Sequence, residues 1–162
     1  MGASGTQEED AIAAKQEEPV YFEDFDISDD ILDSLDEIGY DSPTPIQELA
    51  IPLLLKGRDV IGQAQTGTGK TAAFGIPIIE RVDITKPYVQ ALILAPTREL
   101  AAQIADELLD IAEYRKVRIV TVYGGANMNR QLTDLRRGAQ IVVGTPGRIL
   151  DRKSTRLNSS HT

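Results

Sequence analysis

The residues best suited to chemistry form a glycine-rich segment near the middle of the chain. It follows a segment predicted to be a strand and opens a segment predicted to be a helix. Glycines let backbone N–H groups turn toward phosphate oxygens, and the positive end of a helix favours an anion. In such a phosphate-binding loop, Lys70 would reach the β- and γ-phosphates and the Thr71 hydroxyl would coordinate Mg²⁺. The predicted ligands are Ala64, Gln65, Thr66, Gly67, Thr68, Gly69, Lys70 and Thr71.

This loop predicts a site for a purine nucleotide with Mg²⁺, without indicating which reaction follows. The catalytic roles fall to Lys70 and Thr71, and Thr71 is the expected metal ligand. Ala64 departs from the pattern, which usually begins with glycine, and alanine is acceptable there if its φ angle is negative. The alternative is a glycine-rich turn that binds nothing. It is disfavoured because the strand, the loop, the Lys-Thr pair and the helix occur in the required order.

Three short motifs follow the phosphate loop, each after a segment predicted to be a strand. They are Pro96-Thr97-Arg98-Glu99-Leu100, Gly124-Gly125 and Thr145-Pro146-Gly147-Arg148. Each motif is weak evidence by itself, whereas their order after consecutive strands is specific.

The hydrophobic pattern predicts the elements that must position these loops. Amphipathic helices alternate with short apolar strands, which indicates an α/β fold with a parallel sheet covered on both faces. Ligands of such sheets bind at the carboxyl ends of the strands, where the motifs lie. The predicted helices are 28–39, 45–55, 69–81, 97–114 and 127–137, and the predicted strands are 58–62, 89–95, 117–122 and 140–143.

Composition narrows the function classes. The 162 residues suggest one domain, and no apolar run approaches the roughly 20 residues of a membrane-spanning helix. Cysteine is absent and His161 is the only histidine, which excludes thiolate and histidine metal sites and fits a reducing cytoplasm. Residues 1–40 hold 13 acids and one base (net -12), and the rest hold 12 acids and 16 bases (net +4). A nucleic-acid surface is therefore expected in the second part.

The segment Gly39-Tyr40-Asp41-Ser42-Pro43-Thr44-Pro45-Ile46-Gln47, with Phe22 upstream, resembles the Q motif of DEAD-box RNA helicases. The resemblance covers about residues 20–150. Residues 62–77 are similar to bacterial members of the cold-shock and RNA-degradosome type, in which alanine at the first loop position is normal. The resemblance implies a RecA-like fold with ATP and Mg²⁺ as cofactors. Gln47 would hydrogen-bond the adenine edge, since an amide offers a donor and an acceptor, and Phe22 would stack on the ring. The alternative for Gln47 is a surface helix position.

The resemblance also implies that the three later motifs contact the RNA backbone. Glycines permit close approach, hydroxyls donate to phosphate oxygens, and arginine supplies charge-assisted bonds, so little sequence specificity is expected. Two alternatives are that Gly147 only starts a helix and that Arg98 pairs with a neighbouring acid. The implied RNA ligands are Pro96, Thr97, Arg98, Gly124, Gly125, Thr145, Pro146, Gly147 and Arg148.

The family's Asp-Glu-Ala-Asp motif, which orders Mg²⁺ and the attacking water, does not occur in the 162 residues, and neither does its second RecA-like domain. We therefore expect an N-terminal fragment that binds ATP and RNA without turnover, from a parent that remodels short RNA duplexes. Proteins of ribosome assembly or RNA decay would bind through C-terminal regions. The alternatives are a naturally short, non-catalytic nucleotide- or RNA-binding module and another phosphate-loop enzyme such as a small kinase.

The end of the chain resembles a translated sequencing adaptor and is excluded from the fold. Because the strand of the acidic motif belongs inside the sheet, we expect this chain to be unstable or to aggregate when expressed alone. The expected organisation of the chain has four parts. They are a disordered acidic tail (1–19), a Q-motif region (20–48), a partial RecA-like ATP-binding domain (49–150) and a non-native or disordered tail (151–162).

Overall fold

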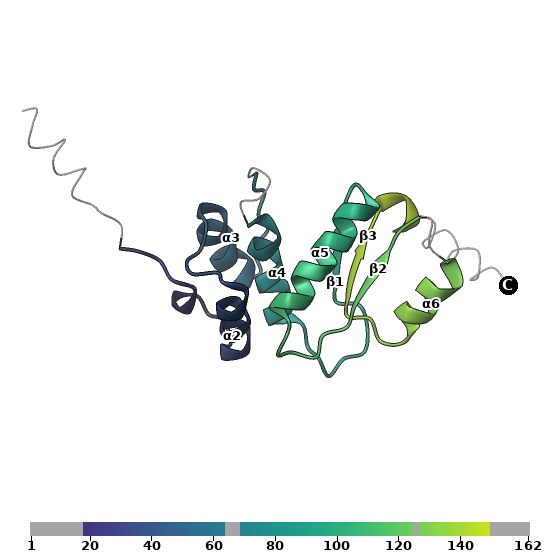
Figure 1. Ribbon diagram of the computed structural model, residues 1–162, viewed down its shortest axis with the longest axis horizontal. Coiled ribbons are helices and arrows are strands. Elements are labelled where there is room, and N and C mark those ends of the chain that lie inside the picture. Colours follow the sequence, from purple (N-terminus) through teal and green to yellow (C-terminus); the bar gives the residue numbers. More distant parts are fainter. Residues whose placement is uncertain (1–17, 64–68, 125–126, 150–162) are drawn as a thin grey trace, which may run out of the picture.

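A computed structural model describes residues 18–63, 69–124 and 127–149 of the chain (Figure 1). Nearly all of both predicted tails lies outside these residues. Among the described residues, no helix is long and apolar enough to cross a membrane. The elements are η1 (Phe22–Asp24), α2 (Asp29–Ile38), α3 (Pro45–Leu55), α4 (Lys70–Arg81), β1 (Ala91–Leu94), α5 (Arg98–Ile111), β2 (Ile119–Val122), α6 (Met128–Arg136) and β3 (Ile141–Gly144).

The three strands form a parallel sheet in the order β1-β3-β2, which confirms the predicted α/β class. Ile93, Ile141 and Val143 belong to the main core with the buried face of α5. Val142 and Val122 form a smaller cluster, against which Leu135 of α6 packs. Helices α5 and α6 therefore cover opposite faces, as expected for parallel strands.

An N-terminal group of helices lies beside the sheet, at the opposite end of the molecule from α6 (Figure 1). Helix α2 ends at Gly39, whose φ of 93° is the left-handed conformation that glycine adopts without strain. Helix α3 begins with Pro45 in its first turn. Helix α4 contacts both α3 and α5, so it connects the Q-motif region to the sheet.

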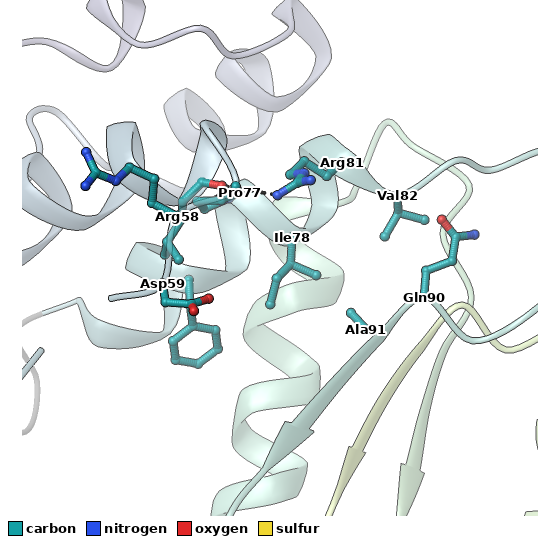
Figure 2. A pocket seen from close by; sticks show the side chains of 11 residues that line it. Arg58, Asp59, Pro77, Ile78, Arg81, Val82, Gln90 and Ala91 are labelled. Carbon is teal, nitrogen blue, oxygen red and sulfur yellow. Dashed lines mark hydrogen bonds between the residues drawn. The ribbon is translucent and has the colours of Figure 1, made fainter. Parts of the chain in front are cut away.

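The predicted strand at 58–62 is wrong, because residues 58–63 form no strand and Ile61 is fully exposed. A strand needs a neighbour for its backbone N–H and C=O groups. A pocket lined by Arg58, Asp59, Ile78 and Ala91 lies between this segment, α4 and the start of β1 (Figure 2). The segment therefore has no strand to pair with among the described residues.

The outer edge of β1 is unpaired in the described sheet. Leu92 and Leu94 point to one face of this strand and are 52% and 54% exposed. An open edge beside exposed leucines favours association with a second chain. This placement supplies a physical basis for the expected aggregation.

Replacing Leu92 and Leu94 together with lysine should reduce self-association of the chain. Removing the two apolar contacts and adding charge should cost about 2 kcal/mol, or about 30-fold in the association constant. Light scattering over a concentration series measures this change. Leu109→Lys is the matched control, because Leu109 is 49% exposed on α5. Equal self-association of the double variant and the wild type would contradict the edge as its cause.

An arginine ties the N-terminal helices to the core. The Arg115 guanidinium donates to both carboxylate oxygens of Asp30 at 2.9 and 3.0 Å and to the Ile79 carbonyl at 2.9 Å. Glu80, 3.5 Å from Arg115, accepts a 2.5 Å hydrogen bond from the Ser28 hydroxyl. The hydrogen bond from Arg115 lowers the pKa of Asp30, against the opposing effect of burial. This cluster fixes α2 against the end of α4.

Asp30→Asn should therefore destabilise the chain at neutral pH. A carboxyl whose pKa is lowered by folding adds stability above its unfolded pKa, and this stability is lost as the pH falls through the folded value, below about pH 4. We expect a loss of about 1–2 kcal/mol at pH 7 and a smaller further loss in acid than in the wild type. Urea unfolding at several pH values measures both, with Asp33→Asn on the exposed face of α2 as control. An unchanged acid dependence would exclude Asp30 as the titrating group.

Candidate nucleotide and RNA site

The Gln47 side chain joins the starts of two helices. It is 1% exposed, so the alternative of a surface position is wrong. Its Oε1 accepts a hydrogen bond from the Thr44 N–H at 3.0 Å, and its Nε2 donates to the Gly69 carbonyl at 3.1 Å. Thr44 precedes α3, and Gly69 precedes α4. One amide therefore couples the Q motif to the end of the phosphate loop.

Gly69 is required by both its backbone and its surroundings. Its φ of +78° is left-handed, and an added Cβ would lie 2.3 Å from Gln47 Nε2. Any other residue here would displace the amide. The next residue, Lys70, is exposed, and Thr71 is partly exposed in the first turn of α4. The predicted ligands Ala64, Gln65, Thr66, Gly67 and Thr68 lie outside the described residues.

The Phe22 ring lies in the core at 3% exposure. Its centroid is 6.4 Å from that of Tyr40, in a stacked arrangement, and 6.2 Å from that of Phe25, edge to face. Phe22 thus packs against Tyr40, which belongs to the segment 39–47 of the Q motif. Stacking of Phe22 on adenine remains a prediction, and it would require one face of this ring to become accessible.

The residues around Gly69 fit a nucleotide. Thr44 Oγ1 is buried and, apart from its place in the capping box at the start of α3, has no hydrogen-bond partner among the described residues. Its hydroxyl proton has no acceptor there, so a nearby ligand group that accepts it would add a favourable hydrogen bond. The described residues bring no three His, Cys, Asp or Glu side chains together around a metal position. The sequence prediction that the Thr71 hydroxyl would hold Mg²⁺ suits the preference of this ion for oxygen ligands.

Backbone hydrogen bonds join the carboxyl ends of the three strands. The Ala95 N–H donates to the Gly144 carbonyl at 2.9 Å, and the Thr145 N–H donates to the Val122 carbonyl at 3.0 Å. The loops that carry Thr97, Gly124 and Thr145 therefore leave the same end of the sheet, where the strands have their carboxyl ends. The sequence motifs predicted this arrangement.

The first loop contacts the second through Arg98. Thr97 caps α5, its Oγ1 accepting from the Leu100 N–H at 3.2 Å, which leaves the hydroxyl proton free to donate. The Arg98 guanidinium lies 5.1 Å from the centre of the Tyr123 ring. Arg98 has an aromatic partner here, and no ion pair with an acid is found for it among the described residues. Sequence reasoning missed Tyr123, whose only signal was its place before Gly124.

The glycines of the later loops are not explained by packing. A Cβ added at Gly124 or at Gly147 would meet nothing within 4 Å, and neither residue has a positive φ. Close approach of a ligand to the backbone would account for both. Gly147 does lie in a helical turn at 146–149, which agrees with the alternative that it starts a helix. Arg148 Nε is buried and has no hydrogen-bond partner among the described residues. Pro96 and Pro146 are exposed, and Gly125 lies outside the described residues.

Known proteins resemble the chain in sequence. A family model described as DEAD/DEAH box helicase matches residues 44–161. The DEAD-box ATP-dependent RNA helicase CshA of Bacillus subtilis is 47% identical over 146 residues, covering 88% of this chain and 30% of that relative. The ATP-dependent RNA helicase CshA of Listeria monocytogenes is 53% identical over 144 residues, covering 87% and 28%. The chain thus spans less than a third of the length of these curated relatives.

Solved structures agree with the fold. A DEAD box protein from Methanococcus jannaschii superposes with a TM-score of 0.78 at 45% identity, covering 81% of this chain and 36% of that one. A Saccharomyces cerevisiae Dbp5 variant bound to RNA and ADP BeF3 gives a TM-score of 0.76 at 34% identity, covering 85% and 34%. The Q motif, the start of α4 and the three joined loops thus occur in a chain that belongs to the DEAD/DEAH box helicase family.

Proposed function

We propose that this chain is the ATP-binding, N-terminal RecA-like part of an ATP-dependent RNA helicase that remodels short RNA duplexes. The observation that carries the proposal is the single end of the sheet from which the loops of Thr97, Gly124 and Thr145 leave. Hydroxyls, arginines and glycines with free space around them, all at one end of the sheet, suit a phosphodiester backbone. They provide few groups that could recognise particular bases. The relatives, which are named ATP-dependent RNA helicases, support the same activity.

In this proposal the chain binds and orients both ligands. Gln47 reads the adenine edge, and Lys70 neutralises the β- and γ-phosphates at the start of α4. The Thr71 hydroxyl holds Mg²⁺, which when bound offsets negative charge on the phosphate oxygens. Gln47 also hydrogen-bonds the Gly69 carbonyl, so base recognition and phosphate recognition depend on one side chain.

The chain itself should not turn ATP over. Hydrolysis in this family needs an acidic pair that orders Mg²⁺ and water, and an arginine finger worth about 10³–10⁵ in rate. The acidic motif is not in the 162 residues, and the alignment spans 30% of the Bacillus subtilis relative. We propose a cytoplasmic site of action, with proteins of ribosome assembly or RNA decay bound through sequence outside these residues.

Binding and turnover of the 162-residue chain test the proposal. A fluorescent ATP analogue should bind and be displaced by ATP much better than by GTP, and no phosphate should be released. Single-stranded homopolymers of different bases should bind with similar affinities. Arg98→Ala should weaken RNA binding by about tenfold, the value of one charge-assisted hydrogen bond, whereas Lys56→Ala should not. Equal displacement by ATP and GTP, or a strong preference for one homopolymer, would contradict the proposal.

A further inference from the structure

A second basic surface lies away from the motif loops. Residues 114–148 contain seven Lys and Arg and one acid, a net of 7 - 1 = +6 in a chain of net charge -8. Lys116, Arg118 and Arg137 from this stretch line one hollow, whose lining includes no carboxylate. All three side chains are exposed, and none forms an ion pair with a described residue.

The hollow lies at the amino ends of the strands. Pro87, which also lines it, precedes β1, Lys116 and Arg118 precede β2, and Arg137 precedes β3. The motif loops leave the carboxyl ends of the same parallel strands, so the two surfaces lie at opposite ends of the strands (Figure 1).

Two side-chain amides, one of them buried, fix the loop at 83–88 beside these cations. Gln140 is 3% exposed, its Nε2 donates to the Ile84 and Lys86 carbonyls at 3.1 Å each, and its Oε1 accepts from the Arg118 N–H at 3.0 Å. Gln90 Nε2 donates to the Lys86 carbonyl at 3.1 Å. The fixed loop presents Tyr88, which is 55% exposed. The hollow therefore combines cations that form no ion pair with a fixed loop, and the exposed Tyr88 directly follows Pro87, which lines it.

Helix capping explains only part of this cluster. Arg118 donates to the Arg137 carbonyl at the end of α6, where cations offset the negative end of the helix dipole. That role accounts for Arg118 and Arg137. It does not account for Lys116 or for the fixed loop with Tyr88.

We propose that this amino-end surface, formed by Lys116, Arg118, Arg137 and Tyr88, binds the backbone of RNA that extends beyond the motif loops. Cations that follow phosphates beside an aromatic on which a base stacks are the common means of holding single strands. RNA is favoured over an acidic peptide because the proposed function already places RNA on the motif loops of the same chain, and the basic stretch includes Arg148 of the last motif loop. This inference rests on the proposed function of the motif loops.

RNA length separates the two surfaces experimentally. Binding of the 162-residue chain to oligo-U of about 6 and about 20 nucleotides compares a length near the lower end of the usual footprint of a single-strand site with a length beyond its upper end. The variant K116Q/R118Q/R137Q should bind the short RNA like the wild type and the long RNA about tenfold more weakly, and the slope of log K against log salt should fall by about 2. The charge-preserving variant K116R/R118K/R137K should keep both affinities.

Each outcome bears on one proposal or on both. If the wild type gains no affinity with length, or the glutamine variant keeps that gain, the amino-end surface does not bind RNA and the proposed function is unaffected. If the short RNA does not bind the wild type, the proposed function fails and this inference fails with it. Binding of poly-glutamate through the same cations, without a length effect, would assign the surface to an acidic protein and overturn the proposal.

Discussion

Replacing Lys70 with alanine is expected to lower the affinity of the chain for ATP by about 10- to 100-fold, because a charge-assisted hydrogen bond to an ionised group is worth about 1.5–3 kcal/mol. Lys70 is exposed at the first position of α4, and no side-chain partner is found for it among the described residues. The free energy of unfolding should therefore change little. Titration of a fluorescent ATP analogue and urea unfolding measure the two quantities separately.

Two controls make the Lys70 result specific. Lys86→Ala removes an equal charge at the far end of the sheet, where Lys86 is 3.9 Å from Asp83, and should leave ATP binding unchanged. Lys70→Arg keeps the charge with a different geometry and should retain part of the affinity. If Lys70→Ala bound ATP as tightly as the wild type, the phosphate role of Lys70 would be lost, and with it the main support for the nucleotide site.

Local patterns predicted most elements because the residues that start and end them are close in sequence. Gly39 ends α2 in the left-handed conformation at the predicted end of that helix, and α5 begins directly after Thr97, where the helix at 97–114 was expected to start. The residue types predict Ser28 as the N-cap of α2, and it does precede this helix, but its hydroxyl donates to Glu80, 52 residues away. The strand expected at 58–62 failed for the same reason, since strand formation depends on a neighbour that local sequence does not specify.

The inward face of α6 was also determined at long range. The helical spacing of Met128, Leu132 and Leu135 predicts that all three point inward, yet Met128 is 36% exposed while Gln131 is 6% exposed. Gln131 Nε2 donates to the Tyr123 carbonyl at 3.0 Å. This hydrogen bond lets a polar side chain be buried on α6 although the apolar pattern did not indicate it.

The candidate site was predictable in its motifs and not in its connections. Residue types and order indicated Gln47 and the three loops, because each motif is contiguous. The bond from Gln47 to Gly69 crosses 22 residues, and the amino-end cations come from separate segments that only the parallel sheet brings together. Spacing along the chain carries no signal for either.

Replacing Gln47 with alanine should affect both stability and base recognition. The change leaves the buried Thr44 N–H and the Gly69 carbonyl without their partner and opens a cavity, which should cost about 2–4 kcal/mol in the free energy of unfolding. ATP affinity should fall by at least about tenfold from the loss of one base contact. Glu48→Ala is the matched control, because Glu48 is the next residue of α3 and is exposed.

Tripolyphosphate distinguishes the two roles of Gln47. This ligand carries the phosphates of ATP without the base, so it reports only on the phosphate loop. If Gln47 reads adenine, Gln47→Ala should lower ATP affinity more than tripolyphosphate affinity, and the preference for ATP over GTP should disappear. If Gln47 only holds the Gly69 carbonyl, both affinities should fall together and the preference should remain. The second result would reduce Gln47 to a positioning residue, because its amide is already bonded to Thr44 and Gly69 within the protein.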